Sequence, residues 1–158
     1  NKFLPKDIPM RGNLEINSLL TLPYSAKPIP NTGQFHIKST TLSIPPSNIR
    51  GFELPHLPLT NLSLKGEFQK ESLQIVEFIL GDEQSPIKAL LQGSILLEKQ
   101  NFMRSNLDLK GTLSFIESFL KEFSFIKLIL KGDPNDQGQY KVRLHGPLGK
   151  PNFQTVKN

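Results

Sequence analysis

The sequence predicts a mainly β protein, a meander of antiparallel strands that forms a curved, twisted sheet with one amphipathic helix at about residues 114–123. The first observation is an apolar residue alternating with a spacer and leading into a glycine, six times along the chain. That alternation has the two-residue period of a strand with one buried face, and the glycine marks a bulge, a tight bend or a strand exit. The six copies are Ile8-Met10-Gly12, Leu62-Leu64-Gly66, Ala89-Leu91-Gly93, Leu107-Leu109-Gly111, Leu128-Leu130-Gly132 and Val142-Leu144-Gly146.

The second and third observations are the chain length and the short connections between strands. A chain of 158 residues fits one domain, so we expect 1–158 to fold around a single core. Short connections favour pairing between strands that are neighbours in sequence. We divide the domain into Pro-rich strands and loops over 1–58, which hold nine of the 13 prolines, and a regular meander with one helix over 59–153.

The Pro-rich part contains two predicted strands, Asn13 to Leu22 and Gln34 to Ile44. In the second, Phe35 and Ile37 share one face, and the alternation resumes at Leu42 before Pro45-Pro46 ends the strand. Proline cannot donate to a strand ladder, so we expect edge strands and irregular loops here.

From residue 59 onward the pattern becomes regular. Strands are predicted around Gly66, over Ser72 to Leu80, over Ile87 to Leu97 and from Asn106, with a turn at 81–86. Over 73–80 apolar residues occupy both faces, with Leu73, Ile75 and Ile79 opposite Val76, Phe78 and Leu80. Such a strand is buried on both sides, or one side binds a hydrophobic ligand or partner.

One helix is predicted to interrupt the sheet. Ser114 and Glu117 have the spacing of a capping box, and the apolar residues that follow fall on one helical face. We then expect a strand over Ile126 to Lys131, a turn at 133–138 and a last clear strand over Gln139 to His145.

Composition excludes several classes of function. Cysteine is absent, which excludes disulfides, thiolate metal sites and cysteine nucleophiles. The net charge of +5 comes from scattered lysines rather than an Arg-rich stripe, so we expect no nucleic-acid partner. The lysines suit solvated strand edges, an anionic membrane face or an acidic partner.

No sequence motif predicts catalysis. His36, His56 and His145 stand far apart in the sequence, and a zinc site would require all three to converge. The paired acids Asp82-Glu83 and Asp133 with Asp136 lie in predicted turns, where Asp is favoured for local hydrogen bonds. We therefore expect no enzyme activity, no catalytic or metal-binding residues and no cofactor.

Apolar surface is the remaining candidate for function. The candidate lipid or partner surface comprises Phe115, Phe119, Leu120 and Phe123 of the predicted helix, with Phe78 on the sheet. The alternative is that the helix covers the sheet as ordinary core.

The segment Leu57 to Leu97 resembles the repeating strands of AsmA-like periplasmic proteins and is similar to the type II secretion system protein N (GspN) family. The resemblance rests on residues 59–66, on the strand Leu73 to Leu80 and on residues 90–97. It extends to the closing segment 142–153, in which a strand is followed by glycine, a short turn and proline. In all it covers roughly residues 57–153.

The resemblance implies the periplasmic domain of a bacterial inner-membrane protein, with a non-catalytic accessory or scaffold role among other secretion-system proteins. The broader relatives imply an alternative, in which an apolar sheet face holds the acyl chains of a lipid. No run reaches the ~20 apolar residues that cross a bilayer. Because the chain begins at Asn1 rather than Met, we expect it to be part of a longer protein whose membrane anchor lies upstream.

Overall fold

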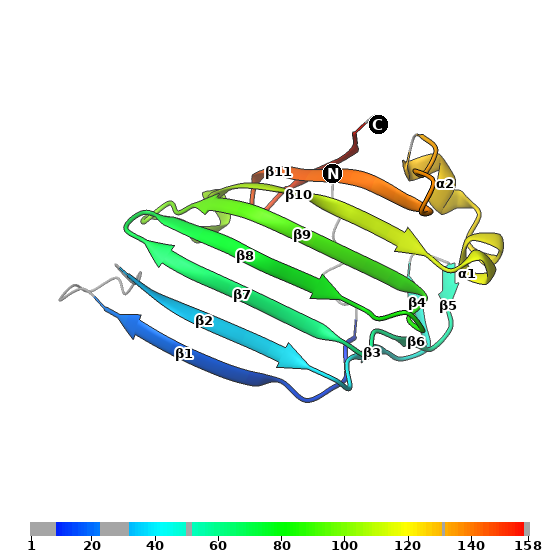
Figure 1. Ribbon diagram of the computed structural model, residues 1–158, viewed down its shortest axis with the longest axis horizontal. Helices are drawn as coiled ribbons and strands as arrows, with labels where there is room; N and C mark the ends of the chain where they lie inside the picture. Colours follow the sequence, from blue (N-terminus) through cyan, green and yellow to red (C-terminus); the bar gives the residue numbers. More distant parts are fainter. Residues whose placement is uncertain (1–8, 23–31, 50–51, 131, 157–158) are drawn as a thin grey trace.

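The computed structural model describes residues 9–22, 32–49, 52–130 and 132–156, and within them it confirms the predicted β fold. Eight antiparallel strands form one open, twisted sheet in the order β1-β2-β7-β8-β9-β10-β11-β12, so strands that follow one another in this sheet are neighbours in space (Figure 1). The bounds of the eight strands are β1 Glu15–Thr21, β2 Thr32–Ser39, β7 Leu62–Gln69, β8 Ser72–Leu80, β9 Ile87–Leu96, β10 Asn106–Phe115, β11 Gln139–Pro147 and β12 Asn152–Thr155.

The connection between β2 and β7 contains the Pro-rich part of the chain. Four short strands pair there as two separate ladders, β3 (Ser43–Ile44) with β6 (Leu57–Pro58) and β4 (Ser47–Ile49) with β5 (Phe52–Leu54). They lie at the end of the sheet that also carries the helices (Figure 1). The single strand expected over Gln34 to Ile44 is therefore wrong in extent: β2 ends at Ser39, and a bend separates it from β3.

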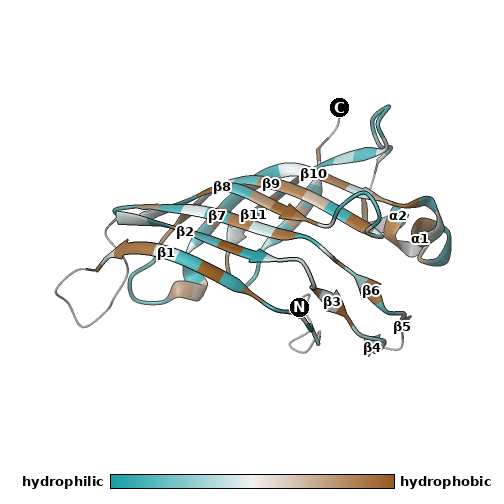
Figure 2. Ribbon diagram, turned by 60° about the horizontal axis from the view of Figure 1, so that its bottom comes forward, coloured by the Kyte–Doolittle hydropathy of each residue, from teal (hydrophilic) through white to brown (hydrophobic). Residues whose placement is uncertain are grey.

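The register places the apolar residues of neighbouring strands on one side of the sheet. Residues directly opposite each other in antiparallel strands point to the same face. We call this side the apolar face. Figure 2 shows the underlying alternation, in which hydrophobic and hydrophilic residues follow one another along the strands. The members of the apolar face include Ile16, Leu20, Phe35, Ile37, Leu64, Phe68, Leu73, Ile75, Phe78, Leu80, Leu91, Ile95, Leu107, Leu109, Leu113, Tyr140, Val142 and Leu144.

The centre of the core lies on the apolar face of β8, β9 and β10. Leu73, Ile75, Ile95 and Leu107 are all buried and pack with Leu97, just beyond β9. The opposite side, which we call the outer face, carries the polar residues between them, among them His36, Lys65, Gln92, Lys110 and Arg143.

A β-bulge in β8 corrects the expected facing of that strand. Lys65 pairs with Glu77 but Gly66 pairs with Ile75, so Val76 is an extra residue without a partner on β7. The extra residue restores Phe78 and Leu80 to the face that holds Leu73 and Ile75. The expectation that Phe78 points away from Leu73 and Ile75 is therefore wrong.

Four of the six glycines lie within strands, so of the expected bulge, tight bend or strand exit they are not exits, and Gly66 lies at the register shift beside the bulge. Gly66, Gly93, Gly111 and Gly146 belong to β7, β9, β10 and β11. A side chain at Gly66 would collide with the ring of Phe35, which packs over it from β2. Gly93 adopts a φ of +147°, and an added Cβ would meet the carbonyl oxygen of Asp108 on β10.

The other two copies of the alternation do not form strands. Leu128 and Leu130 belong to a helix, and Gly132 follows it. In the first copy, Ile8 lies outside the described residues, while Gly12 precedes β1 next to the isolated bridge between Arg11 and Ser43.

Two short helices, rather than one, follow β10. Helix α1 spans Glu117–Glu122 and α2 spans Phe125–Leu130. The strand expected over Ile126 to Lys131 is therefore wrong for 126–130, while Lys131 lies outside the described residues. The capping box is also wrong, because Ser114 lies in β10 and the residue preceding α1, Ile116, makes no side-chain cap. The pairing of Ser114 with both β9 and β11 explains this, since ladder bonds on two sides extend β10 past the predicted helix start.

Both turns predicted around acidic residues are present. In the first, Asp82 accepts hydrogen bonds from the backbone N–H groups of Gln84 and Ser85. In the second, Asn135 accepts from the N–H groups of Gln137 and Gln139. A short 3-10 helix over Phe102–Arg104 connects β9 to β10.

Candidate functional site

Three of the five predicted surface residues meet at the helical end of the sheet. The ring centroids of Phe115 and Phe119 lie 6.2 Å apart in a stacked arrangement, and those of Phe119 and Phe123 lie 4.8 Å apart. Phe115 also contacts the ring edge of Tyr140 on β11. Phe119 and Phe123 are each only 6% exposed, so these rings form a core cluster that anchors α1 to the sheet.

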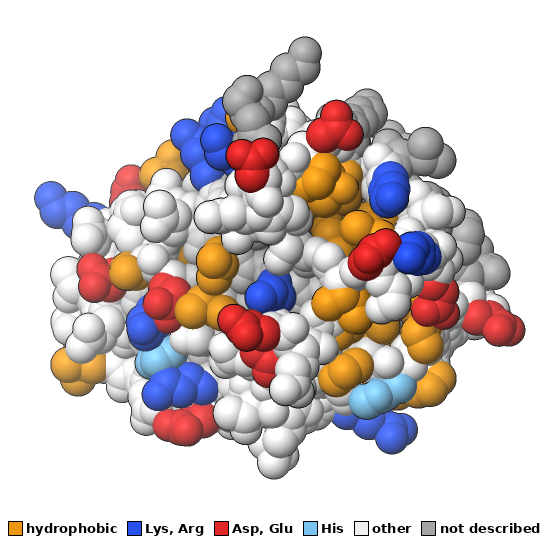
Figure 3. Space-filling view, turned by 45° about the vertical axis from the view of Figure 1, so that its right-hand side comes forward, with side chains coloured by type: hydrophobic (Ala, Val, Ile, Leu, Met, Phe, Trp, Pro, Cys, Tyr) orange, Lys and Arg blue, Asp and Glu red, His pale blue; other side chains and the backbone are white. Residues whose placement is uncertain are grey.

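The other two predicted residues lie apart from that ring cluster. Phe78 sits on β8 and packs against the central core, which contains Leu73 and Ile75. Leu120 is half-buried on α1. Hydrophobic side chains gather at the end of the molecule that carries α1 and α2, with acidic and basic side chains around them (Figure 3).

Exposed apolar side chains are concentrated on β1, away from the five predicted surface residues. All seven residues of β1 are exposed, and Leu19 is 72% and Ile16 62% exposed. Leu14 and Leu22, which flank the strand, are exposed as well. Each singly exposed Leu would be unremarkable, but a whole edge strand of this kind is a candidate interaction surface.

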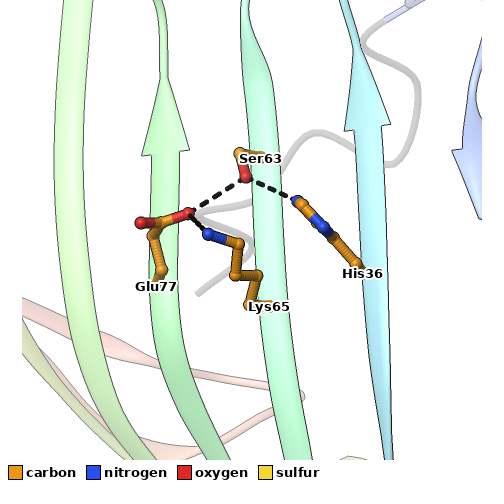
Figure 4. Close-up of polar contacts among 4 residues, drawn as sticks. All are labelled: His36, Ser63, Lys65 and Glu77. Carbon is orange, nitrogen blue, oxygen red and sulfur yellow. Dashed lines mark hydrogen bonds and ion pairs between the residues drawn. The ribbon is translucent and has the colours of Figure 1, made fainter. Parts of the chain in front are cut away.

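A polar network joins three strands on the outer face. His36 from β2 lies with Nε2 2.9 Å from the hydroxyl of Ser63 on β7, and that hydroxyl donates to Oε1 of Glu77 on β8 at 3.1 Å (Figure 4). The same carboxylate oxygen pairs with Nζ of Lys65 at 2.8 Å. Lys65 and Glu77 stand directly opposite each other beside the bulge, which brings this network together.

The network contains a serine, a histidine and a carboxylate, but not in the order of a catalytic triad. In a triad the histidine lies between the serine and the acid, whereas here the serine lies between the histidine and the acid. Because the Ser63 hydroxyl donates to Glu77, it accepts from His36, and the imidazole then cannot act as its base. The geometry suits a structural link between strands.

Two groups of this network have perturbed pKa values. Partial burial lowers the pKa of His36, and Lys38 and Lys65 act in the same direction. The hydrogen bond from Lys65 is the main cause that lowers the pKa of Glu77, with a smaller contribution from Ser63. At neutral pH the network therefore holds a neutral imidazole beside an ion pair.

Shallow depressions lie on the outer face on both sides of the bulge. One, of about 490 Å³, is lined by His36, Lys65, Glu67, Leu19 and Val76 among others. The second, of about 440 Å³, has Ile79, Leu90 and Lys110 in its lining. Both mix charged, polar and apolar groups, and neither gathers groups of one chemistry that would select a ligand.

The three histidines do not converge. His36 on β2 and His145 on β11 are five strand positions apart, roughly 24 Å at the usual spacing between strands, and His56 lies between β5 and β6. Among the described residues no group of three or more His, Asp or Glu side chains is arranged to hold a metal ion. The two acidic pairs remain in their turns, as the sequence predicts.

Sequence reasoning missed the polar network. It expected edge strands in the Pro-rich part, and β1 is one, but it did not single out β1 as an exposed apolar edge. His36, Ser63 and Glu77 are far apart in the chain and occupy ordinary outward positions of their strands, so only the strand register brings them together. One feature of the sequence indicates the open edge weakly. Asn13 to Leu22 contains neither lysine nor proline, the residues that commonly protect an edge strand.

Comparisons with known proteins identify no relative of this chain. Neither a protein-family model, nor a curated protein, nor a solved structure matches the chain. Within the described residues, no helix combines the length and the hydrophobicity that crossing a membrane requires.

Proposed function

We propose that this protein is a non-catalytic scaffold component of a bacterial type II secretion system, the periplasmic domain of an inner-membrane protein that binds other secretion proteins. The observation that carries the interaction role is the exposed apolar edge strand β1. The resemblance of residues 57–153 to the GspN family supports the assignment to secretion.

An exposed edge strand is a binding element because of its unpaired backbone groups. Along one side of β1, alternate residues present N–H and C=O groups that β2 does not use. A partner strand can bond to these groups while its side chains contact Ile16 and Leu20 on the apolar face or Leu19 on the outer face. This mode needs no catalytic group or cofactor.

The experiment is co-purification of the tagged, full-length protein from cells that contain the secretion apparatus. We expect secretion proteins to co-purify with the wild type and to be lost with Leu19→Lys, because a lysine on the edge opposes strand addition. Leu96→Lys is the matched control, since Leu96 is 59% exposed on the outer face of β9, an interior strand. If both variants retain the partners, β1 is not the contact surface. If no secretion proteins co-purify with the wild type, the assignment to a secretion system is contradicted.

A second candidate function is lipid binding on the apolar face. Its supporting observation is that apolar residues from one end of the sheet to the other share this face, so that an extended acyl chain would find apolar contacts across several strands. Several of them, including Phe35, Leu64 and Leu109, are only half-buried against the core and keep surface for further contact.

Mass spectrometry of lipids extracted from natively purified protein separates the two functions. A stoichiometric lipid supports the second candidate, and Ile37→Asp on the apolar face of β2 is expected to remove it. Gln34→Asp on the outer face of the same strand is the control. Purification without lipid contradicts this candidate and leaves the scaffold role as proposed.

A further inference from the structure

The two edges of the sheet differ in the features that protect edge strands from pairing. Strand β12 has four residues and follows Lys150 and Pro151, which are common protecting residues. Strand β1 has seven residues, contains no lysine, arginine or proline, and pairs with β2 without a register shift. Within the described part of the chain, β2 is the only strand that pairs with β1. Among the described residues, the sheet therefore has one protected edge and one open edge.

We propose that β1 pairs with β1 of a second copy of this chain, antiparallel and about a two-fold axis at Ser18. This inference rests on the proposed interaction role of the edge. It names the strand that pairs with β1 when no secretion protein occupies the edge, because one edge can pair with only one strand at a time. A two-fold axis perpendicular to the sheet makes one surface complementary to itself and places the apolar faces of both copies on the same side. The two sheets then join into one continuous sheet.

The sequence of β1 favours this register over its neighbours. With the axis at Ser18, all seven residues pair, and Ile16 lies opposite Leu20 of the second copy on the apolar face. On the outer face Asn17 lies opposite Leu19, and Glu15 lies opposite Thr21, so no like charges meet. Moving the axis to Asn17 sets Glu15 against Leu19 and shortens the ladder. Moving it to Leu19 sets Leu20 against Ser18 instead of Ile16.

The free surface of β1 fits this partner as well. Ile16 and Leu20 are 62% and 41% exposed on the apolar face. In the proposed pairing, Ile16 of each copy contacts Leu20 of the other copy. Glu15 is the single charged residue of β1, so the net charge of +5 per chain is not concentrated at the contact. A ladder of seven residues forms a small interface, so we expect dimerisation that depends on concentration.

Cysteine cross-linking tests the register because the native chain contains no cysteine. In Ser18→Cys the two new thiols lie directly opposite each other, with Cβ atoms about 4.5–5.5 Å apart, close to what a disulfide needs. In Leu20→Cys the two thiols are offset by four residues, roughly 14 Å along the strand. We expect a covalent dimer from Ser18→Cys under mild oxidation and several-fold less from Leu20→Cys. Gln154→Cys on β12 serves as the control for collisional cross-linking.

Sedimentation equilibrium over a concentration series supplies a second measurement. We expect the wild type and Leu96→Lys to show a monomer–dimer equilibrium, and Leu19→Lys to shift it at least tenfold toward monomer with an unchanged thermal unfolding midpoint. A wild type that stays monomeric at millimolar concentration, or equal cross-linking by Ser18→Cys and Gln154→Cys, overturns the self-pairing. If the pure protein is monomeric but co-purification of secretion proteins still requires Leu19, the self-pairing is refuted and the proposed function stands.

Discussion

Arg143 on β11 forms a two-bonded ion pair with Asp108 on β10. Its Nε lies 2.7 Å from Oδ1 and its Nη2 lies 2.8 Å from Oδ2. In the register Arg143 stands directly opposite Lys110, and Asp108 stands opposite His145. The guanidinium therefore reaches diagonally across the ladder to the carboxylate, which offsets the repulsion between the two facing cations.

The ion pair predicts an acid-dependent loss of stability. The hydrogen bond from Arg143 is the main cause that lowers the pKa of Asp108. A carboxyl group with a lower pKa in the folded state stabilises the fold above its unfolded-state pKa, about 3.9, and that contribution is lost as the pH falls through the folded-state pKa. We expect Asp108→Asn to lower the urea midpoint at pH 7 and to differ little from the wild type at pH 2.

The size of this effect should be small, because the side chains of Arg143 and Asp108 are 37% and 40% exposed and water screens the pair. Glu67→Gln, at an exposed position of the outer face of β7, is the control and should leave the midpoint unchanged at both pH values. A difference between Asp108→Asn and the wild type that persists at pH 2 would contradict the electrostatic explanation.

A second prediction concerns Ser85 in the turn between β8 and β9. Its side chain is 1% exposed, and its hydroxyl accepts from the N–H of Asp82, donates to the Asp82 carboxylate and lies 2.9 Å from the hydroxyl of Thr60. Ser85→Ala leaves those groups without this partner, so we expect a loss of about 1–3 kcal/mol in the free energy of unfolding. Urea denaturation measures it, and Ser118→Ala, at an exposed position within α1, is the control and should change little.

A third prediction follows from the bulge at Val76. Deleting this residue leaves Leu73, Ile75, Phe78 and Leu80 at every second position, so the strand keeps all four on the apolar face without a bulge. Deleting Gln74 instead places Leu73 on the opposite face from Ile75. We expect the Val76 deletion to fold and the Gln74 deletion to unfold at a much lower urea concentration. Equal stability of the two deletions would show that the bulge does not set the facing of β8.

The period-two alternation predicted the strands of the meander because each has neighbours on a shared apolar face, and burial of that face fixes both strand and register. It failed where a local feature changed the period. In β8 one extra residue reversed the facing of Phe78. The segment that suggested a strand at Ile126 to Lys131 instead forms a helix, whose Ile126 and Leu130 pack against Tyr140 and Val142. A short apolar run does not distinguish these two structures by itself.

The candidate site was less predictable than the fold. Phe115, Phe119 and Phe123 could be grouped from their helical spacing, and they do meet, but their burial depends on covering strands such as β6 that lie far away in sequence. The polar network of His36, Ser63 and Glu77 depends on the register of three strands and on the bulge. The exposure of β1 depends on its position at the edge, which alternation does not reveal.

The last prediction separates a core role for Phe119 from a ligand-binding role. Phe119 is 6% exposed and contacts the rings of Phe115 and Phe123, so Phe119→Ala removes a buried ring and leaves a cavity at the helical end. We expect a loss of about 3–5 kcal/mol in the free energy of unfolding, whereas Ile116→Ala, at a residue 39% exposed, should cost far less. Urea denaturation of the natively purified variants, with lipid analysis of the same samples, measures both properties. If Phe119→Ala keeps wild-type stability but loses a bound lipid, the ring belongs to a binding surface and its packing role is refuted.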